Sequence, residues 1–208
     1  MSTSSEFWDD LIVDRSWDVL ISLAKEIDFI LIGGWAVYLH TKAIKSKDID
    51  IIVDFEGLEK LKLAHGIKKT DFLKKYETKI NEISVDIYVP FYSKFIIPAE
   101  AVKKNTIRIE GFKVPKPEIL LILKQQAELA RKDSIKGQKD RVDILNLLLN
   151  SGISLKNYIA TAEKYGMENY PRRLKEIVRG ARSEFSYLGI EDARKIKMLK
   201  EKILREIR

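Results

Sequence analysis

Residues 48–53 read Asp-Ile-Asp-Ile-Ile-Val, an apolar strand that begins with two acidic residues. Aspartate is depleted in strands, and a buried charge without a partner is energetically costly. Side chains alternate between the two faces of a strand, so Asp48 and Asp50 share one face while the isoleucines Ile49 and Ile51 pack on the other. The strand rise separates the two carboxylates by about 6–7 Å, which is near enough for them to share a metal ion.

A third acid interrupts another apolar segment, Ile-Ser-Val-Asp-Ile-Tyr-Val at residues 83–89. The same alternation puts Asp86 on the face opposite to Val85 and Ile87. Three carboxylates on neighbouring strands would form an oxygen-rich site suited to Mg²⁺ or Mn²⁺. A structural explanation stays open for each acid alone.

In that structural explanation, Asp48 is merely the residue at which its strand begins. Asp86 would then pair with a lysine such as Lys68 or Lys79.

A glycine pair, Gly33-Gly34, follows a short apolar segment at 29–32 and precedes a short helix predicted at 35–41. Glycine permits positive φ and a close approach of the backbone, and N–H groups at the start of a helix suit phosphate oxygens. Most glycine pairs are ordinary turns. This one is informative because it comes between a buried strand and the Asp-x-Asp strand.

The combined pattern resembles the DNA polymerase β-like nucleotidyltransferase superfamily, and is most similar to its minimal and abortive-infection (AbiEii-type) toxin branch. The matching segments are 32–37, Ile-Gly-Gly-Trp-Ala-Val, and 46–51, Ser-Lys-Asp-Ile-Asp-Ile. Asp86 fits the third carboxylate of the superfamily. Lys124 resembles a downstream helix lysine of that branch, and Lys-Asp-Arg-Val-Asp at 139–143 resembles its Lys/Arg-Asp-x-x-Asp helix.

The resemblance implies an enzyme that transfers a nucleoside monophosphate from a nucleoside triphosphate, ATP for example, to a hydroxyl group. It implies that Asp48, Asp50 and Asp86 are catalytic and bind Mg²⁺ or Mn²⁺. The residues implied to contact the nucleotide are Gly33, Gly34, Ser46, Lys47, Lys124, Asp140 and Asp143. Lys124 would offset phosphate charge, and the last two acids could orient Lys124 or a bound base. Asp140 and Asp143 could instead be acids at the start of a helix near Gly137, stabilised by the helix dipole. Lys124 could instead extend its ammonium to solvent.

One position departs from the family pattern, because Ile44 stands where relatives often carry an arginine. Lys42, Lys45 or Lys47 could substitute for it. Ile44 favours the alternative of a catalytically inactive nucleotidyltransferase-like module that binds nucleotide or nucleic acid. An Asp-x-Asp phosphohydrolase of the haloacid dehalogenase type fits less well, because the apolar residues follow the acids here. A basic helical nucleic-acid binder would leave the strand carboxylates unexplained.

We therefore expect an α+β protein with a nucleotidyltransferase fold, a short mixed β-sheet flanked by helices, over residues 1–115. A C-terminal helical bundle is expected over residues 116–208. Strands are expected at 29–32, 48–53 and 83–89, with a hairpin or edge strand at 106–114. Helices are expected at 7–26, 35–41, 58–64, 117–132, 137–149, 154–165, 170–187 and 190–207. Segment 66–80 is ambiguous, and Trp35, Tyr158, Tyr165, Tyr170 and Tyr187 fit core positions better than base-stacking positions.

The composition limits the remaining possibilities. The chain of 208 residues contains no cysteine and two histidines, which excludes thiolate sites and a multi-histidine metal centre. We expect a cytoplasmic protein without a membrane segment or signal peptide. A charged fraction of 33% resembles thermophile composition. The net charge of +7 permits an RNA or tRNA acceptor or a solvated basic surface, and a toxin role would imply a partner antitoxin.

Overall fold

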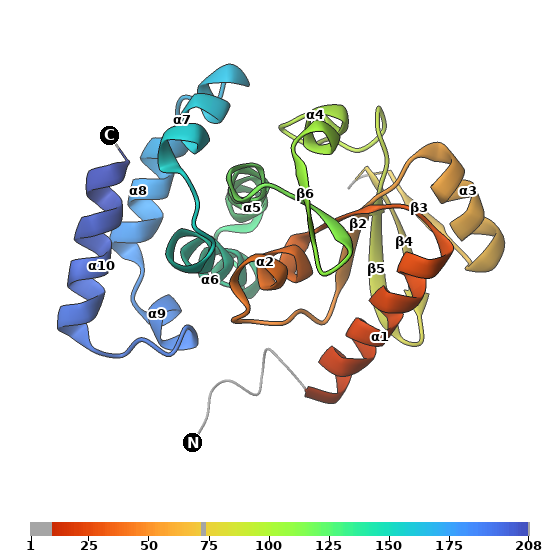
Figure 1. Ribbon diagram of the computed structural model, residues 1–208, viewed down its shortest axis with the longest axis horizontal. Coiled ribbons are helices and arrows are strands. Elements are labelled where there is room, and N and C mark those ends of the chain that lie inside the picture. The colour runs from red at the N-terminus through yellow and green to blue at the C-terminus, as the bar shows by residue number, and fades with distance from the viewer. Residues whose placement is uncertain (1–9, 72–73, 208) are drawn as a thin grey trace. The chain divides into compact units, whose positions relative to one another are not determined.

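The computed structural model describes residues 10–71 and 74–207 (Figure 1). Contacts between residues divide the chain into two compact units, one ending at Lys116 and the other beginning at Pro117. Residues 7–9 of the first expected helix lie outside the described residues. Across the described ranges, no helix combines the length and the apolar content that crossing a bilayer requires.

The first unit is built on a mixed seven-stranded sheet with the order β3-β4-β5-β2-β1-β7-β6. Its strands are β1 (Ile30–Ile32), β2 (Ile49–Ile52), β3 (Lys68–Thr70), β4 (Lys75–Ile80), β5 (Ile83–Tyr88), β6 (Thr106–Ile109) and β7 (Phe112–Pro115). The pairs β2–β5 and β1–β7 are parallel, and the other neighbours are antiparallel. The ambiguous segment 66–80 thus forms β3 and β4, and segment 106–114 forms a hairpin.

The helices of this unit are α1 (Asp10–Glu26), α2 (Gly33–Thr41), α3 (Phe55–Ala64) and α4 (Ala99–Lys104). Figure 1 shows α1, in red, running alongside the sheet, and it contacts β5. Helix α2 starts directly after β1, so the glycine pair forms its first residues. Helix α4 was not expected from the sequence. It is only 6 residues long and follows Pro98, so it gives almost no helical period to detect.

Trp35 belongs to the core of this unit, as expected. Its side chain is fully buried, and its indole Nε1 donates a hydrogen bond of 2.8 Å to Ser16 Oγ of α1. The ring also packs against Trp17, with 5.0 Å between the ring centroids. These contacts join α2, which carries the glycine pair, to α1. A buried indole with its N–H satisfied is a structural residue.

Over residues 117–207 the second unit consists of helices joined by short loops, and those residues form no strand. Its helices are α5 (Pro117–Arg131), α6 (Ile135–Asn150), α7 (Leu155–Lys164), α8 (Tyr170–Gly180), α9 (Ser183–Tyr187) and α10 (Ala193–Glu206). Side chains of Ser134, Ser154 and Asp192 each accept a hydrogen bond from a backbone N–H in the first turn of the following helix. The expected α+β class, a mixed sheet followed by a helical bundle, is confirmed.

The single helix expected at 170–187 was wrong, because the structure has two helices, α8 and α9. The break falls at Ala181 and Arg182, where the backbone N–H of Arg182 donates to the Glu184 carboxylate at 3.0 Å. Glu184 is held in turn by Arg141 Nε at 3.0 Å. This local bond competes with continuation of the helix. The tyrosines follow the core expectation in part: Tyr158 and Tyr170 are buried, while Tyr165 and Tyr187 are half-buried.

Candidate active site

The register of two parallel strands places two of the predicted acids side by side. Asp50 of β2 lies opposite Asp86 of β5. Side chains directly opposite each other in a sheet point to the same face. Asp48 lies two residues before Asp50, and its charge acts on the Asp86 carboxyl. Strand β2 begins at Ile49, so Asp48 precedes the strand and is exposed, whereas we expected it within the strand.

The two faces of these strands differ in burial. The side chains that alternate with the acids are all fully buried, namely Ile49, Ile51, Val85 and Ile87. Asp50 and Asp86 are half-buried. The apolar face is therefore anchored in the core, while the acidic face retains access to solvent.

The glycine bend packs directly against these acids. Gly33 has φ +68°, and a Cβ added to it would come within 2.0 Å of Asp50 Oδ2. A Cβ added to Gly34 would come within 2.6 Å of Ser46 Oγ. A side chain at either position would therefore collide with Asp50 or Ser46. The bend needs glycine for its backbone conformation at residue 33 and for close approach at both residues.

The N-cap residue of α2 supplies no side-chain cap. This residue is Ile32, whose side chain cannot accept a hydrogen bond, and the first turn of the helix contains no acid. The first N–H groups of a helix have no partner within the helix, and they suit an anion. Of the two predicted polar contacts, Ser46 is buried under Gly34 and Lys47 is half-buried.

A lysine that sequence reasoning did not single out contacts the acidic face. Lys75 Nζ of β4 donates a hydrogen bond of 2.5 Å to Asp86 Oδ2, and it lies 3.0 Å from Glu77 Oε1. Glu77 is the residue of β4 directly opposite Asp86, so it adds a fourth carboxylate to this acidic face. The structural alternative in which Asp86 pairs with a lysine is thus correct in kind, but the lysine is Lys75 and not Lys68 or Lys79. The partner could be found only once the register of β4 and β5 was known.

The charges on this face shift the pKa of both partners. Burial raises the pKa of Asp86 above its usual value, the charges of Glu77 and Asp48 raise it further, and Lys75 opposes the rise. Burial lowers the pKa of Lys75, but its contacts with Asp86 and Glu77 outweigh burial and leave that pKa raised. The face thus carries more negative charge than Lys75 neutralises, which is the electrostatic condition for binding a further cation.

The donor set fits a hard divalent cation in kind, because Mg²⁺ and Mn²⁺ prefer carboxylate oxygens. Asp50 and Asp86 also lie in adjacent strands at the same level of the sheet. The side chains as they stand do not converge: within residues 10–71 and 74–207, no three Asp, Glu or His side chains form a group that could hold a metal ion. Asp86 is instead engaged by Lys75.

The other predicted site residues, Lys124, Asp140 and Asp143, come together in the second unit. Lys124 Nζ lies 2.6 Å from Asp143 Oδ2 and 3.7 Å from Asp140 Oδ1. Arg131 also binds Asp140 through two hydrogen bonds of 2.7 and 3.0 Å. Lys124, Asp140 and Asp143 are buried, with 7%, 1% and 2% of their respective surfaces exposed.

This geometry corrects two interpretations of the sequence. Lys124 does not extend to solvent, because its ammonium is held inside the unit by two carboxylates. Asp140 and Asp143 do not belong to a helix start, because α6 begins at Ile135. The alternative in which the two acids orient Lys124 agrees with the observed contacts.

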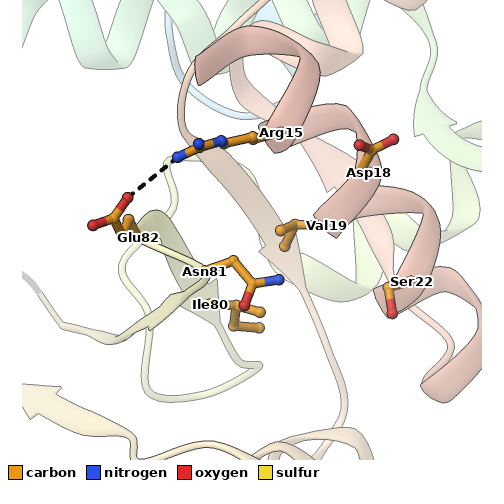
Figure 2. Close-up of a pocket in the computed structure, with 7 residues that line it drawn as sticks. All are labelled: Arg15, Asp18, Val19, Ser22, Ile80, Asn81 and Glu82. Atoms are coloured by element: carbon orange, nitrogen blue, oxygen red, sulfur yellow. Dashed lines mark hydrogen bonds and ion pairs between the residues drawn. The ribbon is translucent and has the colours of Figure 1, made fainter. Parts of the chain in front are cut away.

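A cavity of about 450 Å³ in the first unit is separate from the acidic face (Figure 2). Figure 2 shows side chains of α1 facing the turn between β4 and β5, with one ion pair of 3.4 Å between Arg15 and Glu82 across the opening. The cavity is lined by Arg15, Asp18, Val19, Ser22, Ile80, Asn81 and Glu82. None of the predicted site residues lines it. The candidate active site is therefore the acidic face beside the glycine bend.

Comparisons with known proteins agree with the fold. No protein-family model and no curated protein matches the chain. Among solved structures, a Helicobacter pylori protein assigned as a nucleotidyltransferase is 16% identical, with 100% of this chain and 97% of that chain covered and a TM-score of 0.50. JHP933 from Helicobacter pylori is 16% identical, with 94% and 93% covered and a TM-score of 0.49. The Megavirus polyadenylate synthase is 17% identical, with 77% and 38% covered and a TM-score of 0.47.

The class defined by these observations is a nucleotidyltransferase fold, as the sequence predicted. At 16% identity, the first of these likenesses establishes a shared fold alone. The chemistry has to be argued from the residues of this chain.

Proposed function

We propose that the protein is a metal-dependent nucleotidyltransferase that transfers a nucleoside monophosphate from a nucleoside triphosphate to a hydroxyl acceptor. One observation carries this proposal: Asp50 and Asp86 face each other in register, and the Gly33 backbone approaches Asp50 so closely that no Cβ fits between them. A bend that can receive phosphates thus lies next to carboxylates that can receive their counter-ions.

In this proposal, Asp48, Asp50 and Asp86 hold Mg²⁺ or Mn²⁺, which supplies Lewis-acid stabilisation of charge on phosphate and hydroxyl oxygens. The face needs no nucleophilic side chain, because nucleotidyl transfer depends mainly on positioning and on charge stabilisation. The fully buried Ile49 and Ile51 fix the backbone that carries the first two acids. The Asp86 backbone is fixed in the same way by Val85 and Ile87.

The phosphates would contact backbone N–H groups at the beginning of α2, which Ile32 leaves without a side-chain cap. Lys47 is half-buried and precedes Asp48 in the sequence, and it stays a proposed contact of a phosphate oxygen. Ser46 is buried, so its proposed contact with phosphate would have to be made beneath Gly34. Lys124, which Asp140 and Asp143 orient within the second unit, stays a proposed nucleotide contact.

The acceptor is proposed to be a hydroxyl of RNA, such as a tRNA end, of a protein or of a small molecule. Segment 151–208 contains 14 Lys and Arg against 8 Asp and Glu, a surplus that suits a phosphate-bearing acceptor and equally suits a solvated basic surface. A toxin-type role rests on the family resemblance alone and would imply a partner antitoxin, and the cytoplasmic location stays a prediction.

A catalytically inactive module that binds nucleotide is the second candidate. Two observations favour it: Ile44 stands where relatives often carry an arginine, and the Asp86 carboxylate is engaged by Lys75. The complete set of Asp48, Asp50 and Asp86 supports the enzyme.

The test is incubation with each labelled nucleoside triphosphate, with Mg²⁺ or Mn²⁺, and with tRNA, total cellular RNA and cellular protein as acceptors. We expect transfer of label in at least one combination, its loss in Asp48→Ala, and its retention in Asp18→Ala, which removes an exposed acid of α1. Absence of transfer in every combination, or full transfer by Asp48→Ala, would overturn the enzyme proposal.

A further inference from the structure

The ammonium of Lys75 lies against the Asp86 carboxylate, the position that a metal ion bound to that carboxylate would take. Its ammonium contacts Asp86 Oδ2 at 2.5 Å and Glu77 Oε1 at 3.0 Å. Its side chain is 13% exposed, whereas Lys68 and Lys79 of the same hairpin are exposed. Lys75 is therefore fixed between two carboxylates and is not free to sample solvent.

The strand register explains this placement. Glu77 lies opposite Asp86, and Lys75 lies two residues before Glu77 in β4, so all three side chains point to one face. The row continues to Asp50, which lies opposite Asp86 on the other side. Lys75 thus reaches a row of three acids from one edge, and it engages the acid in the middle of that row.

Asp86 needs a cation in this position, because a half-buried carboxylate among like charges is costly to leave unpaired. Lys75 meets that need without metal. A metal ion bound to the same carboxylate oxygen would have to displace the ammonium. Glu77 gives the displaced ammonium a second carboxylate within the site, at a distance that requires only a small movement of the lysine side chain.

We propose that Lys75 is an internal cation that occupies the Asp86 carboxylate and opposes metal binding, until metal and the triphosphate together displace it towards Glu77. This inference rests on the proposed function, since it assumes that the acidic face binds metal. It implies that metal and nucleotide bind with positive coupling, because each ligand favours the displaced position of Lys75.

The first test is the affinity for Mn²⁺ alone, measured by titration calorimetry or by electron paramagnetic resonance of free Mn²⁺. Lys75→Met removes the competing ammonium and keeps most of the aliphatic stem. We expect it to bind Mn²⁺ about tenfold more tightly than the wild type, because a charge-assisted hydrogen bond no longer has to be broken. Lys79→Met removes the same charge from the same strand and should change the affinity by less than about twofold, since exposed charges are well screened.

The second test uses the unaltered protein and does not depend on how the variants fold. The rate of acetylation of each lysine is measured by peptide mass spectrometry with and without Mn²⁺ and a non-hydrolysable nucleoside triphosphate. We expect the Lys75 rate to rise severalfold when both ligands are present, because the amine leaves Asp86. The Lys79 rate should be unchanged. A Lys75 rate that is unaffected at saturating ligand would overturn the inference.

The outcomes separate this inference from the proposed function. Equal Mn²⁺ affinities in the wild type and Lys75→Met, together with loss of binding in Asp86→Asn, would refute the role of Lys75 and leave the metal site standing. Absence of Mn²⁺ binding at millimolar concentrations in both the wild type and Lys75→Met would refute both. Tighter binding in Lys79→Met as well would show a general effect of charge and would also overturn the inference.

Discussion

The backbone of Gly33 lies against the carboxylate of Asp50, so close that a single added carbon would stand 2.0 Å from Oδ2. The two residues come from different elements: Gly33 begins α2 and Asp50 lies in β2. Antiparallel pairing of Ile32 with Asp50 brings them together. The position of the Asp50 carboxylate therefore depends on the absence of a side chain at residue 33, and this dependence can be tested.

Gly33→Ala is expected to abolish metal-dependent nucleotide binding. Alanine at φ +68° is strained, and its Cβ would displace the Asp50 carboxylate. We expect the free energy of unfolding to fall by about 1–3 kcal/mol and nucleotide affinity to fall at least about tenfold. Urea unfolding and titration calorimetry measure the two effects.

Gly111→Ala is the matched control for that change. Gly111 has φ +87°, but a Cβ there would meet no atom within 4 Å. It should lose about 1 kcal/mol of stability from strain and keep full nucleotide affinity. Similar losses of affinity in both variants would contradict the role of the Gly33–Asp50 contact.

Lys124→Met is expected to destabilise the second unit. It leaves Asp143 and Asp140 buried without the ammonium, and breaking a buried ion pair by removing one partner costs about 3–5 kcal/mol. Faster amide hydrogen exchange in α5 and α6 would reveal the change. Replacing Lys124 and Asp143 together, by Met and Leu, should recover much of the loss. Unchanged exchange in the single variant would mean that the ion pair is not structural.

Glu184→Gln is expected to change how stability depends on pH. Burial raises the pKa of Glu184, but hydrogen bonds from Arg141 and from the Arg182 backbone outweigh burial, so the pKa lies below its ordinary value of 4.5. A carboxyl with a lowered pKa stabilises the folded state above its unfolded pKa, and this contribution is lost as the pH falls through its folded pKa.

The variant should therefore be less stable than the wild type at pH 7, by about 1–3 kcal/mol. The difference should shrink as the pH falls below about 4.5, the ordinary pKa of glutamate. Unfolding by urea between pH 7 and pH 3, followed by circular dichroism, measures it, and Glu191→Gln serves as an exposed control. A difference that stays constant over this range would refute the ionic role of Glu184.

The local parts of the site could be predicted from the sequence, because they depend on short-range rules. The alternation of acids and isoleucines predicted which face of its strand Asp50 lies on. The glycine pair predicted the backbone bend before α2. The fold class followed from the same segments. Residue 86 could be assigned to the acidic face of its own strand, but its place opposite Asp50 depended on which strands are neighbours.

Features that depend on tertiary contacts escaped the sequence. Lys75 is one of several lysines in its region, and only the register of β4 and β5 selects it as the partner of Asp86. Lys124 was predicted to contact the nucleotide, with a solvated helix lysine as the alternative, and its burial comes from the packing of α5 against α6. The break between α8 and α9 likewise depends on Arg141, which is more than 40 residues away in the sequence.

The central claim is that the acidic face binds a nucleoside triphosphate through divalent metal. The most direct measurement is calorimetric titration of the wild type and of Asp50→Asn with each nucleoside triphosphate, in Mg²⁺ and in EDTA. We predict binding of at least one nucleotide that requires Mg²⁺ and that weakens at least about tenfold in Asp50→Asn, because one ligand charge is lost. Binding that is equal in both proteins, or equal with and without Mg²⁺, or absent for every nucleotide, would contradict the account.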